Sequence, residues 1–239
     1  YQAKAGGGSK PVVLVLDPAG RGRWQEEAMY DALAWQGYAV CALDVRGIGD
    51  LTPEYGRGAA WHAGSHNSEQ HYAWASLILG RPLVGQRVSD ILAAAAALRA
   101  RRDLAGRGLA AAARGTLAPA AMLAAAIDRG INMLYLAAGL VSFRNVLDTE
   151  EYLGGNYFSG GRGGDGWFGS FVPGLLKHTD LPEVAASIAP RRVVLAGTVD
   201  AAGKPLDADS VRRAYAAAAN VVVAAEAGWD AAALGAAMG

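Results

Sequence analysis

The chain has 239 residues, of which 52% are hydrophobic and 18% charged, and its 22 basic residues balance its 22 acidic residues. This length suits one large α/β domain with a buried core. A neutral chain without basic runs gives no electrostatic reason to expect a nucleic-acid or anionic membrane partner, and no apolar run reaches the roughly 18 residues of a membrane span.

Strands and helices alternate in the first half of the chain. The apolar run Pro11–Asp17 predicts a strand covered on both faces, and Tyr38–Asp44 predicts a second one. A helix is expected over Gln25–Gln36 between them. A loop-rich section runs from Arg46 to about His66, and a long helix is expected from about Gly85 to Arg101.

The same alternation continues to the end of the chain. Further strands are expected at Gly108–Ala113, Ile131–Ala137, Arg191–Gly197 and Asn220–Glu226, with helices at Leu117–Ala126 and Asp209–Ala218. This order predicts an α/β fold with a doubly wound, mostly parallel sheet. We expect residues 1–239 to form a single domain, and the Gly-rich start without an initiator Met suggests a piece of a longer or processed chain.

The turns after the strands are where such sheets place their sites. Asp17–Gly22 ("DPAGRG") and Asp44–Asp50 ("DVRGIGD") read as tight turns or as loops that contact a ligand directly. Neither is a phosphate loop, because no Lys-Ser or Lys-Thr follows the glycines. Gly160–Gly166 ("GGRGGDG") does not lie between a strand and a helix, so no dinucleotide is expected. We predict no cofactor, and we expect Cys41, in an apolar run, to be a buried thiol.

Several motifs together resemble an α/β-hydrolase, and more narrowly the acetyl xylan esterase-like branch. They are "YAVCALDVRGIGD", "GRPLVGQRVSDILAAAAALRA", the strand-turn-helix around Gly115, "VVLAGTVD" and "VVVAAEAGWD". The resemblance implies a catalytic triad in the order Ser, Asp or Glu, and His, with the Ser inside G-x-S-x-G on a sharp strand-to-helix turn. It also makes a secreted or periplasmic location plausible.

The resemblance places the nucleophile position on Gly115. The family pattern lies over "ARGTLAPAAMLAAAID" without a gap, with Ala113 and Leu117 in place of the flanking glycines. Glycine tolerates the unfavourable backbone of this turn but supplies no nucleophile. Thr116, one residue later, is the fallback nucleophile if the alignment is shifted.

The acid position is kept and the base position is not. Asp200 in "GTVDAAGKP" follows a strand where the family acid is expected, although Asp is also a common turn former. Trp229 in "AGWD" occupies the histidine position, and an indole cannot act as a general base. Losing the nucleophile or the base alone costs a triad nearly all its activity, so we expect no serine-esterase activity.

Histidines outside these positions give weaker signals. A cluster in "WHAGSHNSEQHY" comprises His62, His66, His71 and Glu69. Gly64 and Ser65 argue against a helix that would align the histidines, so no metal site is predicted. His178 precedes a predicted helix start, with Asp180 as its cap and Pro182 in its first turn, and is a poor candidate for a relocated base.

The segment Glu150–Gly174 interleaves aromatic residues with glycines, at a point where the fold commonly carries a lid. The candidate binding residues are Tyr157, Phe158, Trp167 and Phe168. Their rings could stack on sugar faces or dock a partner. Alternatively, they fold down to cap the end of the sheet.

Two hypotheses follow. In the first, the chain is a catalytically silent α/β-hydrolase-fold domain, an accessory or binding module that works with an active esterase domain in the same longer chain or with acetylated carbohydrate. In the second, it is an active carbohydrate-ester hydrolase that uses residues outside the aligned positions or residues supplied across an oligomer. A structure in which a hydroxyl, a base and an acid follow one another at steps of about 3 Å would support the second hypothesis.

Overall fold

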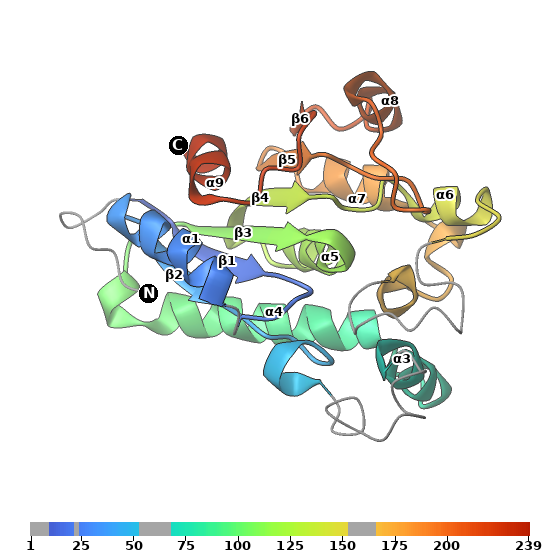
Figure 1. Cartoon of the computed structure of the whole chain (residues 1–239), viewed down its shortest axis with the longest axis horizontal. Coiled ribbons are helices and arrows are strands. Elements are labelled where there is room, and N and C mark those ends of the chain that lie inside the picture. Colours follow the sequence, from blue (N-terminus) through green and yellow to red (C-terminus); the bar gives the residue numbers. More distant parts are fainter. Residues whose placement is uncertain (1–9, 22–23, 53–67, 153–165) are drawn as a thin grey trace.

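The computed structural model describes residues 10–21, 24–52, 68–152 and 166–239. Six strands form one sheet in the order β2-β1-β3-β4-β5-β6, and every pair of neighbouring strands is parallel (Figure 1). They are β1 (Val12–Leu16), β2 (Ala39–Ala42), β3 (Leu109–Arg114), β4 (Ile131–Ala137), β5 (Arg192–Ala196) and β6 (Val221–Ala224). The predicted α/β fold with a parallel sheet is confirmed.

Helices cover both faces of the sheet. They are α1 (Trp24–Trp35), α3 (Ser68–Ile78), α4 (Leu83–Ala100), α5 (Ala118–Ile127), α6 (Phe143–Leu147), α7 (Leu181–Ser187), α8 (Ala208–Ala214) and α9 (Ala231–Met238). On one face, Leu33 of α1 and Leu234 of α9 pack on Val13, Val15 and other strand residues that point the same way. On the opposite face, α4, α5, α7 and α8 bury a larger apolar cluster, so the sheet is doubly wound (Figure 1).

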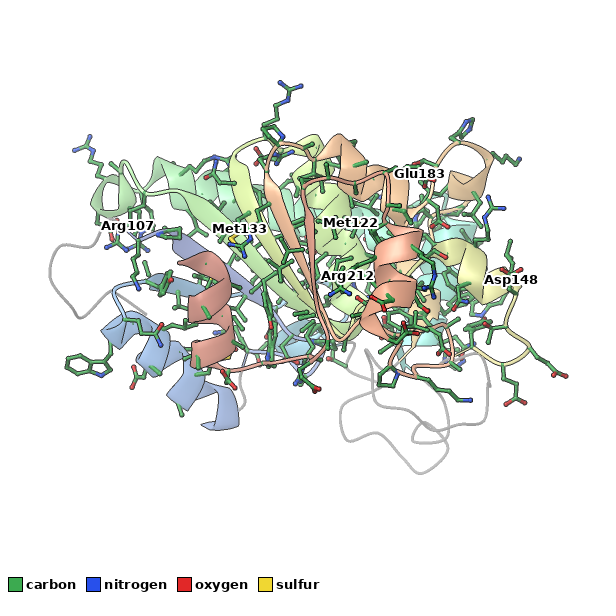
Figure 2. All side chains as sticks on the ribbon, turned by 90° about the horizontal axis from the view of Figure 1, so that it is seen from above. Arg107, Met122, Met133, Asp148, Glu183 and Arg212 are labelled. Carbon is green, nitrogen blue, oxygen red and sulfur yellow. The ribbon has the colours of Figure 1, made fainter. Side chains whose placement is uncertain are left out.

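The two faces follow from the alternation of side chains along each strand. In Figure 2, Met122 of α5 belongs to the larger cluster, while Met133 of β4 packs against the smaller one. Strand β3 is almost entirely alanine, a poor strand former, but it is central in the sheet and its four alanines are buried. Its neighbours on both sides, rather than its own propensity, hold it extended.

The sequence analysis located the strands and five of the described helices, and it missed three others. Helix α7 begins with the predicted Asp180 cap, which forms a capping box with Glu183. Helices α3, α6 and α9 were not predicted. Helix α3 begins at Ser68, so His71 is helical, while His62 and His66 lie outside the described residues.

Two smaller predictions can also be compared with the structure. Cys41 on β2 is half-buried, and this burial raises the pKa of its thiol, which favours the neutral form. None of the helices that the structure describes combines the length and apolar character needed to cross a bilayer.

Candidate functional site

The chain turns sharply between β3 and α5, at a turn that we call the elbow (Figure 1). Gly115 follows the strand directly with φ +53°, in the left-handed region, and a single 3₁₀ turn leads into α5. Among the described residues, a Cβ atom added to Gly115 would meet only Pro18 Cγ, at 3.5 Å, which is an ordinary contact. Space therefore does not exclude a small side chain there, and the left-handed backbone is what favours glycine.

The next residue, Thr116, is buried beneath another segment. It is 3% exposed, and its carbonyl accepts a hydrogen bond of 2.7 Å from the hydroxyl of Ser170. Ser170 is itself buried, at the end of the 3₁₀ turn Trp167–Ser170. The fallback nucleophile therefore lies under the chain that follows β4, without open access to solvent.

Arg114, immediately before the elbow, is held by an acid from the next strand. The sheet register pairs Leu16 with Ala113, so Asp17 and Arg114 follow at the same edge. Nη2 of Arg114 lies 3.0 Å from both carboxylate oxygens of Asp17, whose side chain is buried. The Asp17 carboxylate also accepts the Ala19 N–H at 2.8 Å. The Asp17 carboxylate therefore pairs with the guanidinium of Arg114 and stabilises the turn that begins at Asp17.

Trp229 lies against the same arginine. The guanidinium of Arg114 is 5.5 Å from the centroid of the indole ring, within the range of a cation–π contact. The indole Nε1 is buried and has no hydrogen-bond partner in the described part of the chain.

Residues on and next to the sheet hold the loop that carries Trp229 in place. The hydroxyl of Tyr135, on β4, donates a hydrogen bond of 2.6 Å to the Gly228 carbonyl, and burial raises the pKa of this phenol. Gly197, directly after β5, packs tightly against Ala227 of the same loop, so that a Cβ atom added to Gly197 would overlap Ala227. Asp230 then accepts the N–H groups of the first turn of α9. Trp229 is thus placed beside the elbow by its neighbours in the loop.

Asp200 lies in a turn after β5. Its Oδ1 accepts the Lys204 N–H at 2.8 Å, and the backbone N–H of Asp200 donates to the Lys204 carbonyl at 2.9 Å. One carboxylate oxygen is therefore engaged in the local turn, as expected of a turn-forming Asp.

The fold of the chain resembles that of solved structures. No family model and no curated protein matches the sequence. A candidate acetyl xylan esterase from Bacteroides fragilis matches with a TM-score of 0.62 at 18% identity, over 90% of this chain and 59% of that one. A Butyrivibrio proteoclasticus protein with bound ferulic acid matches with a TM-score of 0.56 at 15% identity, over 93% and 82%. An acetyl xylan esterase from a Paenibacillus species matches with 0.52 at 19% identity, over 90% and 68%.

The chain has the α/β-hydrolase fold. It spans 59% of the Bacteroides protein. In this fold the nucleophile stands on the strand-to-helix turn, and here that turn holds Gly115. The positions proposed for Gly115, Asp200 and Trp229 as triad equivalents stay predictions.

The aromatic residues after β4 differ in their surroundings. Trp167 is 1% exposed and its Nε1 donates a hydrogen bond of 3.0 Å to the Ala201 carbonyl, so its ring packs in the core rather than facing solvent. Phe168 is half-buried, with its ring centroid 5.2 Å from that of Trp74 and 5.8 Å from that of Phe171. Tyr157 and Phe158 lie outside the described residues.

Trp74 is the ring that the sequence analysis did not find. It lies on α3, in "HYAWASLILG", and 48% of it is exposed. The helix that carries it was not predicted, and only the fold brings it beside Phe168. An apolar period along "SEQHYAWASLI" is the signal that could have indicated the helix.

The histidines supply no metal centre in the part of the chain that is described. No group of three or more potential ligands is found among those residues. His71 is half-buried on α3, and Glu69 on the same helix pairs with Arg87 at 2.7 Å. His178 is exposed after the 3₁₀ turn Leu175–Lys177.

Proposed function

We propose that the chain is a catalytically silent α/β-hydrolase-fold domain related to the acetyl xylan esterases, and that it acts as an accessory or binding module. The observation that carries this proposal is the elbow itself. Its left-handed turn is built on Gly115, which has no nucleophile, and the side chains beside it are an arginine and a tryptophan.

The chemistry of these groups supports the absence of acyl transfer. An active site of this class needs a hydroxyl or thiol at the elbow and a base that removes its proton. The guanidinium of Arg114 and the indole of Trp229 have hydrogen-bond donors and no acceptor, so neither takes that proton. Asp17, the nearest acid to Arg114, is buried in an ion pair with it.

The fallback arrangement has little support from its surroundings. Thr116 is buried beneath Ser170, and Asp200 uses one carboxylate oxygen for the turn that ends at Lys204. A working hydrolase built on Thr116 would need this covering segment to move and a base to come from elsewhere. We therefore favour the silent domain over the active hydrolase.

The proposed binding role rests on exposed aromatic surface near the elbow. The segment that holds Phe168 also covers Thr116 through Ser170, so the pair Trp74 and Phe168 lies close to the former reaction site. Flat rings with exposed faces suit the apolar faces of sugars. Acetylated xylo-oligosaccharide is the ligand class that we propose, with an active esterase domain of the same longer chain as the partner.

This proposal predicts that acetylated xylo-oligosaccharides bind the purified chain and that Trp74→Ala weakens the binding about fivefold, because a ring contact is worth on the order of 1 kcal/mol. Isothermal titration calorimetry measures both affinities. Trp35→Ala is the matched control, since Trp35 is also exposed but lies on α1, on the other face of the sheet. No binding, or an equal loss in both variants, would contradict the binding role.

A further inference from the structure

An apolar groove lies outside the elbow region, between α6 and the chain that returns from Phe171 to Lys177. Its volume is about 370 Å³, and its walls are mostly side chains of Phe143, Val146, Leu147, Phe171, Leu175 and Leu176. Leu147 lines the groove and is 75% exposed, so part of the apolar wall is open to solvent. The volume falls in the range of small-molecule sites.

The groove continues into a polar pocket of about 380 Å³. Leu176 and Lys177 line both, so a single ligand can occupy the two spaces at once. The polar pocket adds Arg144 and His178, together with the carboxylates of Asp180 and Glu183.

The two carboxylates are already engaged by backbone groups. Oδ1 of Asp180 accepts the N–H groups of Phe143 and Leu181 at 2.8 and 2.7 Å, and Oδ2 accepts the Arg144 N–H at 3.0 Å. Oε2 of Glu183 accepts the Asp180 N–H at 3.0 Å. These contacts fix the acids as caps of α7 and tie them to α6.

The cationic side chains are not engaged in this way. Arg144 and Lys177 are exposed, and neither side chain forms a hydrogen bond or ion pair with a residue that the structure describes. Asp148, at the other end of α6, is exposed and does not line the groove (Figure 2). The groove therefore has a cationic end at Lys177.

We propose that the groove and the polar pocket together bind a small amphipathic monocarboxylic acid. Its alkyl part lies along Leu147, Leu175 and Phe171, and its carboxylate lies between Lys177 and Arg144. The cationic end fixes the direction of the ligand, because Lys177 and Arg144 offer its carboxylate a counter-charge. The acids of the same pocket, Asp180 and Glu183, are turned to backbone N–H groups. Neither Gly115, Asp200 nor Trp229 lines this site, so the inference does not depend on the proposed function.

The test is a titration of the purified chain with sodium butanoate, hexanoate and octanoate, followed by calorimetry or by NMR shifts. Affinity is expected to rise about two- to fourfold per added methylene, because each buried methylene contributes up to about 0.8 kcal/mol. Octan-1-ol, with the same chain and no charge, is expected to bind about tenfold more weakly than octanoate.

Variants separate the two halves of the site. The double variant Arg144→Gln with Lys177→Gln should weaken octanoate binding about tenfold and leave the affinity for octan-1-ol unchanged. The double control Arg102→Gln with Arg129→Gln removes two exposed charges at the opposite end of the sheet and should leave both affinities unchanged. Leu147→Ser should weaken both ligands, and Leu79→Ser, at 76% against 75% exposure, should weaken neither. Affinity that is independent of chain length, or equal losses in the site and control variants, would overturn the proposal.

Discussion

Gly115 gives the turn between β3 and α5 a left-handed backbone and adds no side chain to it. With φ +53°, it adopts a backbone that costs most other residues free energy, and its position has room for a side chain beside Pro18. A catalytic serine in this fold pays the cost for reactivity. Glycine adopts this backbone with little strain, so it is the stable choice at this turn.

At this scale the account predicts the effect of Gly115→Ser. The variant should fold with a free energy of unfolding lower by about 1 kcal/mol, because serine is strained in the left-handed region while its Cβ meets no clash. Urea unfolding followed by circular dichroism measures this. Gly85→Ser is the control, since Gly85 lies in α4 with open space around it and should cost nothing. Equal stabilities of the two variants would show that the turn is not strained.

The segments that surround the elbow are held by polar contacts inside the protein. Glu69 of α3 and Arg87 of α4 form a 2.7 Å ion pair with side chains 3% and 1% exposed, and Nε of Arg87 donates to the Arg46 carbonyl at 3.0 Å. Gly169 of the covering segment packs so closely that a Cβ there would overlap Oε1 of Glu69. The pair thus joins two helices and the segment that covers Thr116.

Removing the charge of Glu69 is expected to be costly for this part of the structure. Glu69→Gln should lower the free energy of unfolding by about 3 kcal/mol, because Arg87 then stays buried without its counter-charge. The control Asp209→Asn breaks an exposed pair with Arg212 and should cost less than about 1 kcal/mol. Guanidinium unfolding curves compare the two. A similar small cost for both would mean that the buried pair does not hold α3 in place.

Local patterns in the sequence predicted the elements better than the site. The run Ile131–Ala137 predicted β4 to the residue, because a short apolar run between helical segments has few other interpretations. Helix α9 was missed, since its alanine and glycine residues give little amphipathic pattern. Helix α3 was also missed, although its sequence carries an apolar period. Glu69 was considered beside three histidines as a metal ligand, whereas its partner Arg87 comes from another helix.

Contacts between distant parts of the chain explain what the sequence left open at the site. The ion pair of Arg114 with Asp17, the stacking of Arg114 on Trp229 and the contact of Trp74 with Phe168 each join different elements. No spacing along the chain encodes such pairs. The turn of Gly115 could be predicted because its backbone requirement is local to one strand and one helix.

The whole molecule keeps the architecture of an α/β-hydrolase independently of any triad. Its stability rests on the clusters on the two faces of the sheet, which bury Leu14, Leu136 and Leu195 on one side and Val13, Val15 and Leu33 on the other. None of these residues belongs to the elbow. The fold therefore does not depend on the side chains at the elbow.

Hydrolysis of p-nitrophenyl acetate by the purified chain is the measurement that tests this account most directly. We predict that the parent chain, Asp200→Asn and the control Asp207→Asn all release p-nitrophenol at the rate of buffer with albumin, because neither Gly115 nor Trp229 supplies the chemistry of a triad. Asp207 caps helix α8 nearby in the sequence, so Asp207→Asn removes the same charge as Asp200→Asn without touching Asp200. Turnover by the parent that Asp200→Asn abolishes and Asp207→Asn retains would contradict the silent domain and make Thr116 the first residue to replace.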